Sequence, residues 1–157
     1  MRIAVAGDTH GEIKLVVRVL KEVVKPALIL FTGDHYRDGI KIGDTLRIPV
    51  KAVSGNCDHR QAGPGEEIVI IQGHRILLVH GHQYKVKTSM LPLKLRAAEV
   101  NAEVVCFGHT HQGGCELVDN TWFINPGSPT YPRFGEPSLA VVEIDAQHIL
   151  PQIINLN

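Results

Sequence analysis

Residues 104–111 read VVCFGHTH, in which four apolar residues lead into a glycine and then into two histidines one residue apart. Because alternate side chains of an extended backbone point the same way, His109 and His111 are expected on one side of the chain. Imidazole is a good ligand for transition metals, but two imidazoles fill only part of a coordination sphere. The stretch therefore predicts a metal site whose other ligands come from elsewhere in the sequence.

The composition is that of one globular domain, expected to span residues 1–157 and to bury a core without disulfides. Sixteen Lys and Arg residues balance sixteen Asp and Glu residues, which argues against a dedicated nucleic-acid or membrane surface. The three cysteines match neither a zinc ribbon nor a disulfide framework, and the N-terminus lacks the pattern of a secretion signal. These features predict a cytoplasmic protein.

The first third of the sequence alternates between strand and helix patterns. Apolar runs at residues 2–6, 27–32 and 48–53 predict strands, and apolar residues at helical spacing predict a helix over residues 14–25, ended by Pro26. Residues 35–47 are less regular, and we expect a loop with a short helix there. Strands joined by crossovers indicate a parallel sheet.

The remaining sequence predicts a hairpin of residues 67–71 and 75–79, then a helix over residues 88–100 with Ser89 as its cap and Pro92 in its first turn. Short strands are expected at residues 115–118, 121–124, 138–144 and 149–154. Tight turns between them favour an antiparallel meander after His111. The prediction is thus one α/β domain with a parallel half and an antiparallel half.

Five of the predicted strands end in metal-binding residue types beside a glycine. Sites in open α/β sheets form outside the carboxyl ends of the strands, so these clusters should converge. Each motif alone is common in turns and caps, but their repetition at every such strand end is improbable by chance. Seven ligands suit two metal ions that share one carboxylate. The candidate ligands are Asp8, His10, Asp34, Asn56, His80, His109 and His111.

The order Asp-x-His, Gly-Asp, Gly-Asn, His-Gly and Gly-His-x-His, running from Gly7 to His111, resembles the calcineurin-like metallophosphoesterase superfamily. The sequence Gly-Asn-Cys-Asp at residues 55–58 is similar to that of its small single-domain YfcE-like phosphodiesterase branch. The resemblance implies an α/β fold, a four-layer αββα sandwich of two mixed β-sheets flanked by helices. It also implies that residues 125–128, Asn-Pro-Gly-Ser, form a loop lining the site.

The same resemblance implies how the ligands are divided. Asp34 would bridge two divalent cations, expected to be Mn²⁺, with Ni²⁺, Fe, Zn²⁺ and Mg²⁺ as alternatives. With a bridging hydroxide the site would keep about one net positive charge, which suits a phosphodiester monoanion attacked by metal-bound hydroxide. One cation would be held by Asp8, His10, Asp34 and His111, and the other by Asp34, Asn56, His80 and His109.

Cys57 stands where many superfamily members have a histidine that protonates the leaving oxygen. Either the enzyme favours diesters with acidic leaving groups, or His82 or Asp58 supplies the proton. The alternatives are that Cys57 only packs and that His82 only orients His80. Arg37, Arg60 and Arg133 could contact phosphate, although solvated loop charges are commoner. The candidate catalytic residues are Asn56, Cys57, Asp58, His80, His82 and His109.

Three functions are consistent with the sequence. The first is a metal-dependent phosphodiesterase acting on a small phosphodiester substrate, and we favour it because all seven ligand positions hold coordinating residues. The second is a scaffold that keeps the fold without catalysis, as in the retromer subunit that resembles this branch. The third is a phosphomonoesterase, disfavoured by the missing histidine at position 57. Small members of the branch are often dimeric or tetrameric, so the resemblance also implies a homodimer or a homotetramer.

Overall fold

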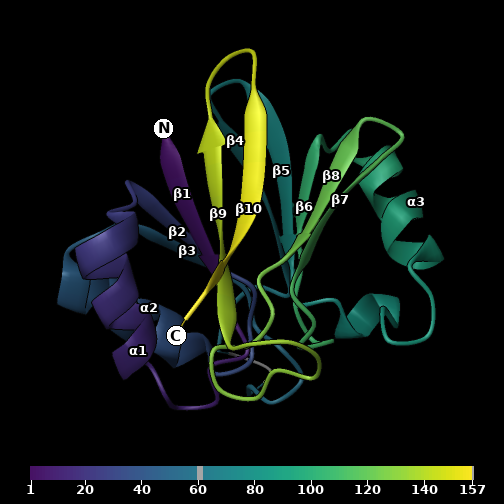
Figure 1. Ribbon diagram of the computed structural model, residues 1–157. Helices are drawn as coiled ribbons and strands as arrows, with labels where there is room; N and C mark the ends of the chain where they lie inside the picture. The colour runs from purple at the N-terminus through teal and green to yellow at the C-terminus, as the bar shows by residue number, and fades with distance from the viewer. Residues whose placement is uncertain (60–61, 157) are drawn as a thin grey trace.

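The computed structural model describes residues 1–59 and 62–156, whose strands form two five-stranded sheets that face each other (Figure 1). In the first sheet, β1 and β2 are parallel, as are β2 and β3, whereas β9 is antiparallel to both β1 and β10. This sheet has the order β10-β9-β1-β2-β3 and consists of β1 (Arg2–Ala6), β2 (Leu28–Phe31), β3 (Val50–Ala52), β9 (Ser138–Ile144) and β10 (Ile149–Asn155).

The second sheet is also mixed. Its strands β5, β6 and β8 run parallel, and the edge strands β4 and β7 pair antiparallel with β5 and β8. The order is β4-β5-β6-β8-β7, made of β4 (Glu66–Ile71), β5 (His74–Val79), β6 (Val104–Cys106), β7 (Gly114–Val118) and β8 (Thr121–Asn125).

Helices cover the outer faces of both sheets (Figure 1). The first sheet is covered by α1 (Lys14–Val19), which continues as the π-helical turn η1 (Leu20–Val24), and by α2 (Tyr36–Leu46). The second sheet is covered by α3 (Leu91–Glu99), with the 3-10 turn η2 (His82–Tyr84) nearby. The expected four-layer αββα sandwich is confirmed.

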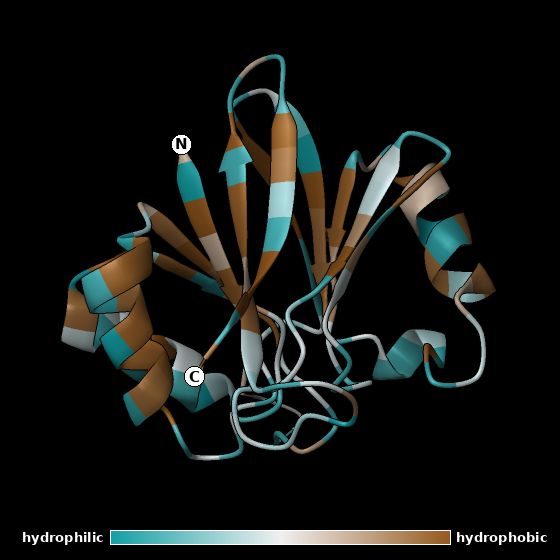
Figure 2. Cartoon of the chain, viewed as in Figure 1, coloured by the Kyte–Doolittle hydropathy of each residue, from teal (hydrophilic) through white to brown (hydrophobic). Residues whose placement is uncertain are grey.

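The central strands are mostly hydrophobic (Figure 2), and three buried hydrophobic layers explain why. Neighbouring strand residues point into different layers: Ile3 lies between the two sheets, whereas Ala4 faces α1 and α2. In the second sheet, Val104 lies between the sheets and Val105 faces α3. Because both faces of each central strand are covered, the strands read as continuous apolar runs.

Helix α2 is longer than the expected short helix in a loop, because its buried face is built partly from glycine. A Cβ atom on Gly39 would lie 2.6 Å from Cγ of Phe31, and one on Gly43 would lie 2.9 Å from the carbonyl oxygen of Ile48. These glycines let α2 approach the sheet closely. They contribute no apolar side chain, so the helical hydrophobic pattern is weak.

The residues after His111 do not form a single antiparallel meander as expected. The β7–β8 hairpin joins the second sheet, where β8 lies parallel to β6, and the β9–β10 hairpin joins the first sheet. Each hairpin is part of a different sheet. The turn residues between the strands do not indicate which sheet a hairpin joins. Helix α3 begins later than expected, at Leu91, whose N–H is accepted by Oγ of Ser89.

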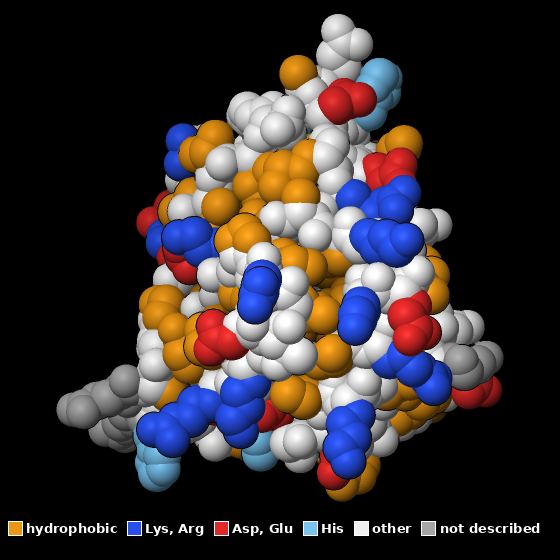
Figure 3. Space-filling view, turned by 90° about the vertical axis from the view of Figure 1, so that its left-hand side faces the viewer, with side chains coloured by type: hydrophobic (Ala, Val, Ile, Leu, Met, Phe, Trp, Pro, Cys, Tyr) orange, Lys and Arg blue, Asp and Glu red, His pale blue; other side chains and the backbone are white. Residues whose placement is uncertain are grey.

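The outer surface is mixed in character. Lys and Arg side chains are spread over the face shown in Figure 3, with acidic and hydrophobic side chains between them. Within the described residues, none of the helices has the length and apolar character needed to cross a membrane.

His74 provides a test of the packing between β5 and the start of β6. Its Nδ1 lies 2.7 Å from Oε2 of Glu103, and this hydrogen bond raises the pKa of His74. The pair should therefore stabilise the fold below the unfolded-state pKa of about 6.5, and the gain should be lost as pH rises through the higher folded-state pKa. We expect Glu103→Gln to cost about 0.2–1 kcal/mol at pH 6 and less at pH 9, measured by urea unfolding. An equal cost at both pH values would contradict this assignment.

Candidate metal centre

The loops that follow β1, β2, β3, β5 and β6 meet at one edge of the two sheets, the lower edge in Figure 1. Parallel strands place their carboxyl ends together, so each loop delivers its polar residues to the same place. The structure thereby gathers the side chains that the sequence singles out, although they are up to 103 positions apart, from Asp8 to His111.

One group of donors consists of Asp8, His10 and His111. Oδ1 of Asp8 lies 3.3 Å from Nε2 of His111, and the Nε2 atoms of the two histidines are also 3.3 Å apart. The donor atoms of all three residues lie within 4.8 Å of one another, close enough to share a metal ion.

A second group lies beside the first and contains Asp8, Asp34 and His80, all of them buried. Nε2 of His80 lies 3.4 Å from Oδ1 of Asp34 and 3.1 Å from Oδ1 of Asn56. The ring of His109 is next to this group, with its centroid 5.0 Å from that of His80. Asp34 also forms a group with His10 and Cys57, so this carboxylate lies between the two clusters.

The residues present fit divalent cations. Oδ1 of Asp8 is buried and has no hydrogen-bond partner among the residues that the structure describes, which is costly for a carboxylate oxygen. Carboxylate, amide and imidazole donors together suit first-row transition metals. A cation in contact with Asp8 would supply the interaction that this oxygen lacks.

Hydrogen bonds to the far side of two rings fix their orientation. Nδ1 of His80 lies 2.9 Å from the carbonyl oxygen of Thr32, and Nδ1 of His111 lies 2.8 Å from that of Tyr131. A carbonyl oxygen can only accept a hydrogen bond, so in the neutral ring Nδ1 carries the proton and an unprotonated Nε2 faces the centre. That is the tautomer needed to bind a metal.

The histidines differ in their affinity for protons. Burial, together with the charge of His80, lowers the pKa of His109 to about 4, and burial also lowers the pKa of His10. The neighbouring carboxylate of Asp8 raises the pKa of His111. At neutral pH His109 and His10 are therefore in the neutral form that a metal would bind, whereas His111 has the higher affinity for a proton.

Five candidate ligands have left-handed backbone conformations, which are unusual for residues other than glycine. Such strain is typical of functional sites, where the surrounding structure holds the backbone in place. The φ angles are 50° for Asp8, 48° for His10, 50° for Asp34, 69° for His109 and 57° for His111.

Residues outside the sequence motifs hold these loops. Asp38, which is buried on α2, accepts hydrogen bonds from Oγ1 of Thr9 and from the N–H of Gly11, each 2.8 Å long. Oγ of Ser128 donates to the carbonyl oxygen of Asp8 at 2.8 Å. Ser128 belongs to the loop that the resemblance implies at the site. Asp38 was not among the candidates, because it lies in the segment expected to be a loop with a short helix and belongs to no motif.

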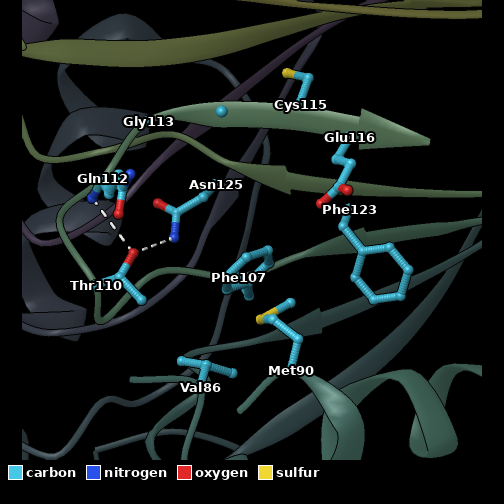
Figure 4. Close-up of a pocket in the computed structure, with 11 residues that line it drawn as sticks. Val86, Met90, Phe107, Thr110, Gln112, Gly113, Cys115, Glu116, Phe123 and Asn125 are labelled. Carbon is cyan, nitrogen blue, oxygen red and sulfur yellow. Dashed lines mark hydrogen bonds between the residues drawn. The ribbon is translucent and has the colours of Figure 1, made fainter. Parts of the chain in front are cut away.

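An apolar pocket of about 320 Å³ lies beside Thr110, the residue between His109 and His111 (Figure 4). Nδ2 of Asn125 donates to Oγ1 of Thr110 at 2.9 Å at one end of this pocket, and Phe107, Met90 and Phe123 line the other. None of the candidate ligands lines it. The pocket therefore lies outside the candidate metal centre.

The three candidates for leaving-group protonation occupy different positions. Both oxygens of Asp58 accept backbone N–H groups, from Tyr36 at 2.8 Å and from Gly55 at 2.9 Å. Nδ1 of His82 is buried without a hydrogen-bond partner among the described residues, and its ring centroid lies 5.3 Å from that of His80. Cys57 is exposed as a residue, but its sulfur is partly buried. This partial burial, together with the nearby carboxylate of Asp34, raises the pKa of the thiol to about 11.

The N–H of Arg133 donates to the carbonyl oxygen of His111 at 2.9 Å, which places this residue at the edge of the centre. Arg37 is exposed on α2. Arg60 lies outside the described residues.

Comparison with known proteins identifies the family. The family model of the calcineurin-like phosphoesterase superfamily domain matches residues 1–147. The chain belongs to this superfamily.

Several calcineurin-like phosphoesterases are similar over nearly the whole chain. A probable metallophosphoesterase of Methanothermobacter thermautotrophicus is 33% identical over 98% of this chain and 92% of the relative. The probable metallophosphoesterase YsnB of Bacillus subtilis is 31% identical over 85% of this chain and 78% of the relative. The phosphodiesterase YfcE of Escherichia coli is 26% identical over 98% of this chain and 97% of the relative.

Solved structures agree with the calcineurin-like fold. A predicted phosphoesterase of Streptococcus pneumoniae matches with a TM-score of 0.85 at 26% identity, over 99% of this chain and 89% of that chain. Vps29 of Entamoeba histolytica, complexed with zinc, matches with a TM-score of 0.80 over the full length of both chains. At 24% identity, this second likeness concerns the fold alone.

Proposed function

We propose that this protein is a dinuclear metal-dependent phosphodiesterase that hydrolyses a P–O bond of a small phosphodiester in the cytoplasm. The observation that carries the proposal is the pair of adjoining donor groups around Asp8 and Asp34. Two such groups are typical of hydrolytic sites with two ions about 3.5–4 Å apart. The name of YfcE, a phosphodiesterase similar over nearly the whole chain, supports the same reaction.

Each side chain has a defined task in this proposal. Two divalent cations, when bound, would lower the pKa of the attacking water and neutralise charge on the phosphoryl oxygens. Asp34 would bridge them, and Mn²⁺ is the expected metal. The first cation would be held by Asp8, His10, Asp34 and His111, and the second by Asp34, Asn56, His80 and His109.

The preference for diesters follows from the residue at position 57. A thiol is a much weaker acid than the imidazolium it replaces, so a poor leaving group would depart without an efficient proton donor. The oxygens of Asp58 are engaged by two backbone N–H groups, which leaves His82 as the better placed alternative donor. Substrates with acidic leaving groups need no such proton.

The proposal is tested by metal analysis combined with turnover. We expect purified protein to bind two equivalents of Mn²⁺ per chain and to hydrolyse bis(4-nitrophenyl) phosphate faster than 4-nitrophenyl phosphate. A panel of Mn²⁺, Ni²⁺, Mg²⁺ and Zn²⁺ identifies the best metal. Full metal occupancy without turnover of any ester would contradict the proposal and favour a scaffold role.

Cys57→His is expected to raise turnover of monoesters more than turnover of diesters. An imidazole at this position would lie near Asp34 and could protonate a poor leaving oxygen, an effect of about 10²–10⁴-fold in general acid catalysis. The measurement is the monoester-to-diester ratio of kcat/KM at pH 6–8. Cys57→Ser is the matched control, because it changes the side chain without adding an acid. An unchanged ratio in the histidine variant would refute the acid explanation.

A further inference from the structure

A second hollow, of about 340 Å³, adjoins the metal centre on the side of Asn56, where Asp58 and His82 line it. On the side of His109 and His111, a separate hollow of about 320 Å³ has a different lining. Its other walls are Lys87, Thr110, Tyr131, Pro132 and Arg133. We call this the Lys87–Arg133 hollow. The two arms of a bound diester would therefore meet different surroundings.

Two cations give the Lys87–Arg133 hollow its character. Lys87 lines the same hollow as His109 and His111, which brings its positive charge close to these candidate ligands. Arg133 is fixed through its backbone, whose N–H donates to the carbonyl oxygen of His111 at 2.9 Å. Both side chains are exposed to solvent and so are accessible to a ligand.

Neither Lys87 nor Arg133 forms a salt bridge with another residue that the structure describes. Among residues 1–59 and 62–156, the structure has no carboxylate within 4.0 Å of the charged nitrogens of Lys87 or Arg133. By contrast, Lys51 pairs with Glu67 at 2.8 Å, and Arg96 pairs with Glu66 at 2.5 Å. Two unpaired cations beside one hollow are an arrangement suited to phosphate.

Tyr131 adds an apolar wall between this hollow and the centre. Its ring centroid lies 5.7 Å from that of His10, and the side chain is 61% exposed. An organic group linking two phosphates could therefore lie against an aromatic face while its ends contact the metal centre and the two cations.

We infer that the Lys87–Arg133 hollow binds a second phosphate of the substrate, so that the enzyme prefers phosphodiesters carrying a terminal phosphate, such as a phosphorylated nucleotide end. This inference rests on the proposed function. Lys87 and Arg133 act as specificity-determining residues, because they contact the part of the substrate that does not react.

The test compares two chromogenic diesters that differ only in that phosphate: thymidine 5′-(4-nitrophenyl phosphate) with and without a 3′-phosphate. We expect the 3′-phosphate to lower KM about three- to tenfold in low salt, as for exposed charge pairs, and the advantage to shrink in high salt. Lys87→Ala and Arg133→Ala should each reduce the advantage, and Lys87→Glu with Arg133→Glu should reverse it. Equal KM values for the two esters in the unmodified protein would overturn the inference.

Matched controls are Lys94→Ala on α3 and Arg75→Ala on β5, neither of which lines the hollow. Both should keep the preference for the 3′-phosphate. If they lost it as Lys87→Ala does, net charge rather than the hollow would be responsible, and the inference would fall.

A binding measurement separates this inference from the proposed function. Calorimetry on the Mn²⁺-loaded protein compares thymidine 3′,5′-bisphosphate with thymidine 5′-monophosphate, neither of which needs to be hydrolysed. Tighter binding of the bisphosphate that depends on Lys87 and Arg133 supports the hollow even if no ester is turned over. Turnover of both esters with equal binding of the two nucleotides leaves the phosphodiesterase intact and rejects the second phosphate site.

Discussion

Asp34→Asn is expected to abolish phosphodiester hydrolysis and to weaken metal binding at both positions. Asparagine keeps the shape of the side chain but removes the negative charge that two cations would share. Burial raises the pKa of Asp34, but His80 and the N–H of Cys57 outweigh burial, so that the pKa is lowered and the carboxylate is ionised. The loss of kcat/KM should exceed the roughly 10–100-fold cost of removing a residue that only supports a ligand.

Metal analysis and thermal unfolding measure this effect separately from activity. In unmodified protein, Mn²⁺ should raise the melting temperature, because it binds the folded state. In Asp34→Asn the rise should be small, whereas the metal-free melting temperature should be nearly unchanged. Asp44→Asn, which removes an exposed carboxylate from α2, is the control and should behave as the unmodified protein does. Two tightly bound ions in Asp34→Asn would rule out the bridging role.

Gly55→Ala is expected to have the second largest effect, because the loop after β3 passes directly over Asp34. A Cβ atom at position 55 would lie 2.5 Å from the backbone nitrogen of Asp34 and would collide with its Oδ1. The loop must move, at a cost of about 1–3 kcal/mol in the free energy of unfolding, as for other overpacked positions. Displacing Asp34 or Asn56 by about 1 Å should lower kcat roughly 10²-fold.

Gly65→Ala is the matched control, since a Cβ atom there meets nothing within 4 Å. Urea unfolding and diester turnover should both be unaffected in this variant. A Gly55→Ala protein with unmodified stability and activity would show that the loop can relax freely, contrary to its close contact with Asp34.

The sequence predicts the convergence of the candidate ligands because strand direction decides it. Parallel β1, β2 and β3 must present their carboxyl ends at one edge, so that residues such as Asp8 and Asp34 meet regardless of loop detail. The sandwich itself was implied by the motif resemblance, and the two mixed sheets confirm it. That the gathered residues bind metal remains a prediction.

Other features could not be predicted because they depend on contacts between distant segments. The sequence pattern of helix α2 is weak because its buried face includes Gly39, which approaches Phe31, and Gly43, which approaches Ile48. The Lys87–Arg133 hollow joins two loops 46 positions apart. The sequence names Arg133 as a possible phosphate contact, but it gives no reason to pair it with Lys87, which lies in no motif. Asp38 is recognisable only once α2 brings it to the loop of Thr9 and Gly11.

The left-handed backbone at Asp8, His10, Asp34, His109 and His111 bears on how such a chain can evolve. Each of these residues costs stability, of order 1–3 kcal/mol for a strained conformation, and glycine would adopt it with far less strain. A descendant in which glycine replaced these candidate ligands would therefore gain stability. This chain holds all five despite that cost, as expected of residues that serve function rather than folding.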